Sequence, residues 1–463
     1  MTRAHEIGRS LSDLLGWSEA SWEQVEVRES PTALATWMPI ADMAAAAQGL
    51  VGLAAAAVHQ ARGGPAQTVE IDRWEASLSM TSAAYLTVDG EKAVSWDPLT
   101  GYHRAADGWV YTHCQFAHLR DRLLAALKLP NDPEVVKARL AQMPAQQIED
   151  IAQAAGVCGI RMRSRDEWQA HPHGQHLAND PVVSLLRIGD ASAPDRQRNT
   201  DKHPNAPLSG IKVLDLSRVI AGPMIGRTLA EHGAQVMRIG AAHLPSFDSL
   251  VIDTGFGKRA AYVDLREAEG RNTLKNLTQQ ADILIDGYRP GALARHGFGI
   301  DALREMNPSI VYIGLSAFGE TGPWGGRRGY DTYVQAATGL TAIGENGPER
   351  LPCQPLDYLG GYLGAATAMI ALLRQMREGG AWHADLALAR NAGWIWEWTD
   401  KLGPEPDPPA ANPTLAEIAD LKVEIASDYG RVSSLRPARS LSLTPPRLAS
   451  PPVRLGSDQP VWL

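Results

Sequence analysis

The sequence predicts an α/β protein with a parallel β-sheet and a smaller α+β region. Short apolar runs alternate with helical segments after residue 210, and a strand-like alternation precedes helical segments between residues 96 and 190. Of the 463 residues, 44% are hydrophobic and 21% are charged, as in soluble globular proteins. At roughly 150 residues per domain, the length predicts about three domains. A chain of this size can bury a large core without disulfides or structural metals.

The α/β pattern begins at Ile211. Apolar runs typical of buried strands cover residues 211–216, 236–239, 283–285 and 310–315. Helical patterns cover residues 225–232, 267–280 and 302–306. Strands that alternate with helices favour a parallel sheet covered on both faces. Ligands of such sheets bind at the carboxyl ends of the strands.

The segment before this sheet has mixed character. Trp109 to His113 alternates between apolar and polar residues, as a strand does. Helical patterns follow over residues 119–127, 135–140 and 147–155. We therefore expect residues 96–190 to form a small α+β domain.

A repeated pattern links the N-terminal part of the chain to the α/β region. In both parts a Pro-x-Asp or Pro-x-x-Asp segment precedes an Ala- and Gly-rich helix and a short strand. Three pairs of matching residues stand 315 positions apart: Asp42 and Asp357, Arg62 and Arg377, and Glu70 and Asp385. A shared offset favours a duplicated supersecondary unit over a chance likeness between two Ala-rich helices.

Two breaks in composition divide the chain. Residues 191–207 are rich in Asp, Arg, Asn and Pro, which is typical of a linker. Residues 404–413 contain five prolines, so they cannot form the interior of a helix or strand. The expected domains are a partial repeat of the helix unit (1–95), the small α+β domain (96–190), the linker (191–207), the large domain (208–402) and a Pro-rich C-terminal extension (403–463).

Charge and cysteine content limit the partners and the compartment. The net charge of −8 argues against a nucleic-acid-binding protein. Cys114, Cys158 and Cys353 are isolated, which fits a reducing cytoplasm better than a disulfide scaffold. The apolar stretch at residues 43–58 is shorter than the ~20 residues that span a bilayer, so we interpret it as a buried helix. We expect a cytoplasmic protein with no membrane or nucleic-acid partner.

Asp357 is the strongest candidate for a catalytic residue. It follows Pro355 and precedes Gly360 and Gly361 at the start of a helix of small residues. A carboxylate there meets free backbone N–H groups and the positive end of the helix dipole. Carboxylates can act as covalent nucleophiles, and the same N–H groups could stabilise an oxyanion. The alternative from composition alone is a simple N-cap aspartate.

Several loops carry basic residues that could hold phosphates. For each of them taken alone, the sequence favours a solvated surface charge. The basic candidates on these loops are Arg218, Lys258, Arg259, Arg289, Arg295, Arg327 and Arg328. No G-x-G-x-x-G or Walker A pattern is present. His171, His173 and His176 lack a Cys or carboxylate at ligand spacing, so no metal site is expected.

From Ile211 onward the chain resembles the class III CoA-transferases, also called the CaiB/BaiF family. This family includes formyl-CoA and carnitine CoA-transferases, and alpha-methylacyl-CoA racemase is a relative. The matching motifs occur in family order and spacing, at residues 213–219, 221–223, 257–259, 263–265, 288–291, 295, 316–319, 322–323, 329–331 and 355–357.

The resemblance implies a Rossmann-like large domain, a small domain and an interlocked homodimer. It places the catalytic aspartate at Asp357. It implies that CoA and acyl-CoA are substrates, with no tightly bound cofactor and no metal. The residues it implies for CoA binding are Arg218, Val219, Ala221, Lys258, Arg259, Tyr288, Arg289 and Arg295.

The implied reaction moves CoA from an acyl-CoA to a carboxylic acid through an aspartyl anhydride and an aspartyl-CoA thioester. An acyl-CoA racemase or epimerase is one alternative. However, Tyr330 stands where the racemase relative has His, so a second acid/base group is lacking. A catalytically silent CoA-binding subunit is another alternative. We expect Asp42 to be structural or vestigial, and residues 96–113 and 163–176 to shape the substrate pocket.

Overall fold

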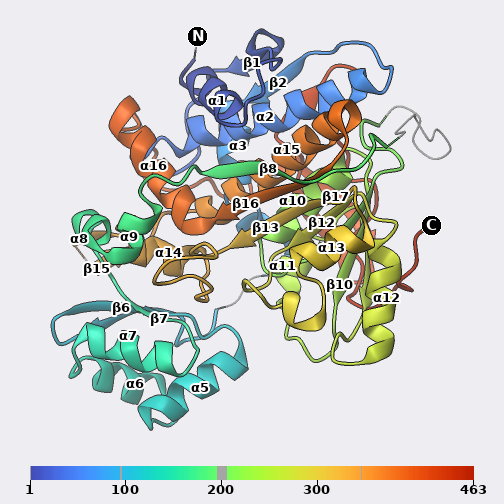
Figure 1. Cartoon of the computed structure of the whole chain (residues 1–463). Coiled ribbons are helices and arrows are strands. Elements are labelled where there is room, and N and C mark those ends of the chain that lie inside the picture. The colour runs from blue at the N-terminus through green and yellow to red at the C-terminus, as the bar shows by residue number, and fades with distance from the viewer. Residues whose placement is uncertain (1, 94–95, 195–205, 346) are drawn as a thin grey trace.

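The computed structural model describes residues 2–93, 96–194, 206–345 and 347–463. A seven-stranded sheet lies at its centre, with the strand order β11-β10-β9-β12-β13-β16-β8 (Figure 1). Every neighbouring pair is parallel except β16 with β8. The strands are β8 (Val183–Gly189), β9 (Lys212–Leu216), β10 (Gln235–Gly240), β11 (Lys258–Tyr262), β12 (Ile283–Asp286), β13 (Val311–Ser316) and β16 (Ala381–Ala387).

The predicted parallel α/β sheet is confirmed by this arrangement. Strands β9, β10, β12 and β13 fall on the predicted apolar runs, and their side chains are almost all buried. Strand β8 was not predicted as part of the sheet. It lies in the segment assigned to the small domain, yet it pairs antiparallel with β16 and closes one edge. Residues 195–205 of the predicted linker, which follow β8, lie outside the described residues.

Helices cover both faces of the sheet. The helix expected at residues 225–232 begins earlier, at Ala221, and contains Pro223. Proline is tolerated there because N–H groups of the first turn have no partner within the helix. The helices of this part are α10 (Ala221–Glu231), α11 (Asp248–Asp253), α12 (Ala268–Thr278), α13 (Ile300–Met306), α14 (Asp331–Thr338), α15 (Pro355–Glu378) and α16 (Leu388–Leu402), with a hairpin of β14 (Ala342–Gly344) and β15 (Gly347–Glu349).

A small α+β region packs beside the sheet, at the lower left of Figure 1. Its antiparallel sheet has the order β5-β6-β7, and its helices form a separate apolar core. The predicted strand and the three predicted helices of this segment are confirmed. The elements are β5 (Gly101–Ala105), β6 (Gly108–Thr112), α5 (Ala117–Leu127), α6 (Pro133–Leu140), α7 (Ala145–Ala154), β7 (Gly159–Arg161), α8 (Arg165–Ala170) and α9 (Pro172–Leu177).

The N-terminal part repeats the arrangement around α15. Helix α2 (Ile40–Ala61) lies between the parallel strands β1 (Val25–Arg28) and β2 (Val69–Asp72), as α15 lies between β13 and β16. Strand β19 (Arg439–Leu441) pairs antiparallel with β2, as β8 does with β16. Each unit therefore receives its edge strand from the other half of the chain.

Helices α2 and α15 pack against each other in the middle of the molecule (Figure 1). Both are long and apolar enough to cross a membrane, but 94% of the apolar window of each is buried inside the protein. The expectation of a buried helix at residues 43–58 is thus confirmed. The remaining elements are α1 (Arg3–Leu14), α3 (Arg73–Ser79), α4 (Ser82–Tyr85) and the sheet of β3 (Thr87–Val88), β4 (Glu91–Lys92), β17 (Lys422–Ser427) and β18 (Gly430–Leu435). Residues 404–413 contain no helix or strand, as their prolines predict.

Candidate active site

A cavity of about 310 Å³ lies at the carboxyl ends of β9, β12 and β13. Strand order reverses between β9 and β12, and such a switch point is where open α/β sheets bind ligands. We call this space the basic cavity. Six of the nine predicted site residues line it: Arg218, Val219, Ala221, Tyr288, Arg289 and Asp357.

The first turn of α15 places Asp357 in the cavity. Pro355 is the first residue of this helix, where its fixed φ favours helix initiation. The helix has no side-chain cap from its own N-cap residue. Asp331, at the start of α14, supplies the cap: its Oδ2 accepts hydrogen bonds from the backbone N–H groups of Leu356 (2.8 Å) and Asp357 (3.0 Å). The Asp357 side chain therefore serves no capping role.

The Asp357 carboxylate is 5% exposed. Among the residues that the structure describes, none donates a hydrogen bond to it. Burial, with a further contribution from the negative charge of Asp331, raises the pKa of Asp357 well above its usual range. Burial likewise raises the pKa of Asp331 to about 6. A buried carboxylate without a partner is costly, and such sites are typical of catalytic groups.

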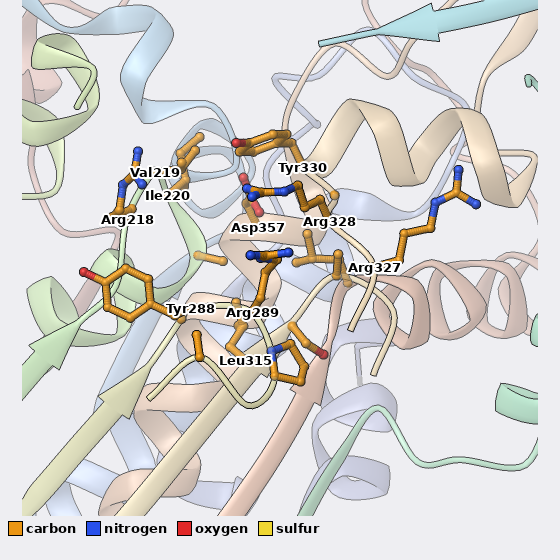
Figure 2. A pocket seen from close by; sticks show the side chains of 18 of the residues that line it. Arg218, Val219, Ile220, Tyr288, Arg289, Leu315, Arg327, Arg328, Tyr330 and Asp357 are labelled. Atoms are coloured by element: carbon orange, nitrogen blue, oxygen red, sulfur yellow. The ribbon is translucent and has the colours of Figure 1, made fainter. Parts of the chain in front are cut away.

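Basic side chains surround the mouth of this cavity. Figure 2 shows the guanidinium groups of Arg289 and Arg328 pointing toward Asp357, with Arg218 on the opposite side. Burial and the charges of Arg328, Arg295 and Arg122 lower the pKa of Arg289. Helix α10 also begins here, at Ala221. Clustered guanidinium groups beside a helix N-terminus suit a phosphate-bearing ligand.

Arg327 serves a different purpose from Arg328. Its side chain points away from Asp357 (Figure 2) and donates to Glu149 on α7 at 3.1 Å. Glu149 also accepts from Arg163 at 2.9 Å, and it is 2% exposed. This buried triad joins the small α+β region to the loop that carries Arg328 and Tyr330.

A second, smaller space lies on the other side of Asp357. It has a volume of about 40 Å³, and we call it the aromatic cavity. Val219, Ile220, Tyr330 and Asp357 line both cavities, so Asp357 stands at their junction. The remaining side chains come mostly from the small α+β region and α11, namely Trp96, Tyr111, His113, Gln115, Phe116, Phe247, Leu250, Asp331, Thr332 and Gln354.

Val219 has a strained backbone at this junction. Its φ of +72° lies in the left-handed region, which a β-branched residue rarely adopts. Such strain is found at functional sites where surrounding structure enforces it. Here it turns the chain between β9 and α10, so that Arg218 and Val219 both line the basic cavity.

Asp42 occupies the position in α2 that Asp357 occupies in α15, but its surroundings differ. Its two oxygens accept from Arg73 at 2.8 and 3.1 Å, and Arg73 also binds Glu405 at 2.5 Å. Asp42 is 1% exposed and lines neither cavity. The expectation that Asp42 has a structural role agrees with this ion pair.

The structure does not bring three of the predicted CoA-binding residues into the basic cavity. Lys258 is buried, where it binds Asp215 at 2.7 Å and the carbonyl of Pro223 at 2.6 Å. Arg259 binds Asp458 and the carbonyls of Gln459 and Val461 in the C-terminal segment. Arg295 is exposed, near enough to Arg289 to affect its pKa but outside the lining.

Sequence reasoning missed much of the aromatic cavity and one buried arginine. Of residues 96–113, which were expected to shape the substrate pocket, Trp96, Tyr111 and His113 line the aromatic cavity. Residues 163–176, of which the same was expected, line neither of these two cavities. His173 instead binds the carbonyl of Phe318 at 2.7 Å, within an aromatic cluster.

The alternation from Trp109 to His113 was the available signal, since it puts Tyr111, in β6, on the same side of the chain as His113, which follows the strand. No pattern in the sequence singled out Arg238. It is 6% exposed on β10 and lies near Arg218 and Tyr288, and its buried Nη1 has no hydrogen-bond partner within the described residues.

Comparison with known proteins gives several matches. The chain is 29% identical over 321 residues to acetyl-coenzyme A transferase nodX of Hypoxylon pulicicidum, covering 64% of this chain and 54% of that protein. It is 34% identical over 267 residues to an acyl-CoA transferase of Fusarium pseudograminearum, covering 48% and 59%. With the succinate–glutarate CoA-transferase of Agrobacterium fabrum, identity is 32% over 203 residues, covering 39% and 51%.

The chain thus spans about half to two-thirds of the length of the curated relatives it matches. A solved CAIB/BAIF family protein from Brucella suis superposes with a TM-score of 0.40 at 27% identity, covering 42% of this chain and 57% of that one. The sequence profile of CoA-transferase family III matches residues 8–188 and 208–416, which is most of the chain. The chain therefore belongs to CoA-transferase family III.

Proposed function

We propose that the protein transfers CoA from an acyl-CoA to a carboxylic acid, with Asp357 as the nucleophile. One observation carries this proposal: a buried carboxylate that accepts no hydrogen bond from the described residues stands at the junction of the basic and aromatic cavities. The CoA phosphates would lie among Arg218, Arg289 and Arg328, and the acyl group would lie in the aromatic cavity. Membership of CoA-transferase family III supports the same assignment.

The proposed reaction begins when an Asp357 oxygen attacks the thioester carbonyl. The carbon–sulfur bond breaks, CoA leaves as a thiolate and a mixed anhydride forms. The thiolate then attacks the aspartyl carbonyl, which releases the donor acid and leaves an aspartyl-CoA thioester. The acceptor carboxylate attacks this thioester, and the released thiolate attacks the acceptor carbonyl of the second anhydride. Acceptor-CoA and the free Asp357 carboxylate result.

The raised pKa of Asp357 suits this chemistry. Burial and Asp331 destabilise the negative charge of Asp357, so its conversion into a neutral anhydride or thioester relieves an unfavourable charge. The cost of the ionised form is thereby partly recovered in the covalent intermediates.

We further propose that the seven-stranded sheet is Rossmann-like, because its first six strands follow the 3-2-1-4-5-6 pattern of that fold. A homodimer remains a prediction from the resemblance. However, His113, Phe116 and Asp357 of one chain already line a common cavity, which supports a site completed within a single chain. The three cysteines are free and buried, which supports the predicted cytoplasmic location.

A racemase or epimerase reaction has weaker support. It requires a second acid/base group near the α-carbon, and His113 is the histidine that lines the aromatic cavity. Burial lowers the pKa of His113 to about 3, so its imidazole is a poor base. Exchange of deuterium at the α-carbon of an acyl-CoA, without any acceptor acid, would support this alternative instead.

A transfer assay tests the proposal. The protein is incubated with an acyl-CoA donor and a ¹³C-labelled carboxylic acid, and labelled acyl-CoA is measured by mass spectrometry. We expect transfer by the wild type and a loss of roughly a thousandfold or more in Asp357→Ala. Asp420→Asn, at an exposed position, is the matched control and should keep full activity. CoA binding without transfer would instead support the silent-subunit alternative.

A further inference from the structure

The aromatic cavity restricts the size of the group beside Asp357. Its volume is about 40 Å³. A water-sized group needs roughly 10–15 Å³ on this measure, so the cavity holds about three such groups. Trp96 and Phe247, with ring centroids 6.2 Å apart, stand at one side, and Tyr111, Phe116 and Tyr330 enclose the rest.

The charges of the lining restrict the chemistry of that group. No Lys or Arg is among the described residues that line the aromatic cavity. Two carboxylates, Asp331 and Asp357, do line it. A second carboxylate on the acyl group would therefore be buried beside like charges and without a cation, which is strongly unfavourable.

His113 is the polar exception in this aromatic lining. It is 7% exposed and stacks on Tyr330 with ring centroids 4.0 Å apart. Its buried Nδ1 has no hydrogen-bond partner within the described residues. Buried polar atoms are nearly always hydrogen-bonded, so an unpaired imidazole on a cavity wall indicates a ligand that bonds to it.

Two of the other neutral polar groups of the lining are engaged. The Gln115 Oε1 accepts from the backbone N–H of Asp97 at 2.9 Å, and the Tyr111 hydroxyl bonds to Thr332. The Gln354 amide, the Tyr330 hydroxyl and the Trp96 indole N–H also line the cavity and make no side-chain hydrogen bond to another described residue. Substitutions Gln354→Leu, Tyr330→Phe and Trp96→Phe therefore distinguish these groups from His113.

We infer that the aromatic cavity selects a short, uncharged acyl group with one hydroxyl or carbonyl oxygen, and that His113 hydrogen-bonds to that oxygen. The inference rests on the proposed function, because it names the acyl group that Asp357 would carry. It makes His113 a specificity-determining residue. It also separates this chain from an enzyme built for dicarboxylic acyl groups.

Two isosteric pairs of acyl-CoAs test the inference. 3-Hydroxypropionyl-CoA and butyryl-CoA differ by a hydroxyl in place of a methyl group, as do lactoyl-CoA and isobutyryl-CoA. The measured quantity is kcat/KM for transfer of CoA from each donor to the same ¹³C-labelled carboxylic acid. We expect the hydroxyacyl member of at least one pair to be favoured by roughly tenfold. Succinyl-CoA and hexanoyl-CoA should both react at least roughly tenfold more slowly than the favoured substrate.

Variants assign the hydrogen bond. His113→Phe keeps a ring against Tyr330 and removes the nitrogen atoms, so the preference within the pair should fall to near unity. His113→Gln should retain a preference, since it keeps a hydrogen-bonding group. Phe116→Leu, on the same cavity, should change the tolerated chain length and leave the hydroxyl preference intact.

Each remaining outcome contradicts a defined part of the inference. Equal kcat/KM within both pairs, or a preference for succinyl-CoA, overturns it while leaving the proposed function standing. A preference that survives in His113→Phe and disappears in Gln354→Leu also overturns the assignment to His113. Failure of every acyl-CoA to react at Asp357 overturns the proposed function itself. Near-ultraviolet circular dichroism verifies that each variant is folded.

Discussion

At the residue scale, two aspartates at equivalent places in a repeated unit have opposite environments. Asp42 accepts two hydrogen bonds from Arg73, whereas Asp357 accepts none from the described residues and faces Asp331. A carboxylate held by a bidentate guanidinium is stabilised in its charged form and is poorly nucleophilic. An ionised carboxylate that has no hydrogen-bond donor and lies beside another carboxylate is higher in free energy, which favours its reaction as a covalent nucleophile.

The coupling between Asp331 and Asp357 predicts a pH effect. Asp331→Asn removes the neighbouring negative charge and keeps one acceptor oxygen for the start of α15. The pKa of Asp357 should fall, because one of the two causes that raise it is removed. Acyl transfer to Asp357 should then persist to lower pH, with the acid limb moved by ~1 pH unit. The rate of CoA release as a function of pH measures this, and an unmoved or upward-shifted limb would refute the coupling.

The sequence identified Asp357 because its residue type, helix position and surrounding motif agree. Lys258 and Arg259 belong to a motif of equal visibility, yet they bind Asp215 and the C-terminal segment. The sequence around a basic residue does not indicate which group it will bind. The partner of Arg259 lies 199 positions away. The sequence did not single out His113, because its role depends on a tertiary contact, the packing of Tyr330 against its ring.

At the element scale, the position of Asp357 depends on close packing of α15 against α10. A Cβ added at Gly361 would lie 2.6 Å from the Cβ of Met224 and 3.2 Å from the carbonyl oxygen of Ala221. Small residues on α15 therefore bring its first turn next to the start of α10 and the basic cavity.

This contact predicts opposite effects of one substitution at two helical glycines. Gly361→Ala should destabilise the protein by about 1–3 kcal/mol, because α10 and α15 must separate. Gly393→Ala on α16, where nothing lies within 4 Å of the added Cβ, should stabilise it by about 0.5–1 kcal/mol. Urea denaturation measures both free energies of unfolding. Equal effects at the two sites would show that the α10–α15 contact is loose.

The triad around Glu149 predicts how firmly the small α+β region is attached. Glu149→Gln leaves Arg163 and Arg327 without a buried counter-charge, so the free energy of unfolding should fall by about 3–5 kcal/mol. Glu134→Gln removes an exposed pair with Lys137 on α6 and should cost less than about 0.5 kcal/mol. Chemical denaturation of both variants tests this. A small effect of Glu149→Gln would mean that other contacts hold the region in place.

Local patterns predicted strands β9, β10, β12 and β13 and about half of the described helices, because each of these carries its own periodicity, whereas the start of β11 was expected in a basic loop. They did not predict β8, whose place in the sheet depends on pairing with β16, about 200 positions later in the chain. Exposure does not alternate along this strand, and no local pattern in the sequence indicates its partner.

At the scale of the whole molecule, the two halves of the chain complete each other. Strand β8 from the first half closes the sheet of the second, and β19 from the second half closes the sheet of the first. The aromatic cavity likewise combines β6 of the small α+β region with α15. The offset of 315 residues predicted the duplication, but the exchange of strands is a tertiary arrangement that a repeat does not reveal.

The different surroundings of Asp42 and Asp357 predict one working site per chain. Asp42→Asn should leave kcat/KM for transfer within about twofold of wild type, because a change at a distant site acts independently of the residues around Asp357. It should lower the free energy of unfolding by about 3 kcal/mol, because Arg73 loses a buried partner. Transfer assays and thermal unfolding measure the two effects. Loss of all activity in a folded Asp42→Asn protein would assign Asp42 a catalytic role.

Covalent trapping at Asp357 is the measurement that tests the central claim most directly. The protein is incubated with a panel of acyl-CoAs, treated with hydroxylamine at neutral pH and mapped by peptide mass spectrometry. We predict a single hydroxamate, on Asp357, that is absent from Asp357→Asn and present in Asp42→Asn. A hydroxamate on another residue, or none in a protein that binds CoA and transfers it, would contradict catalysis by the Asp357 carboxylate.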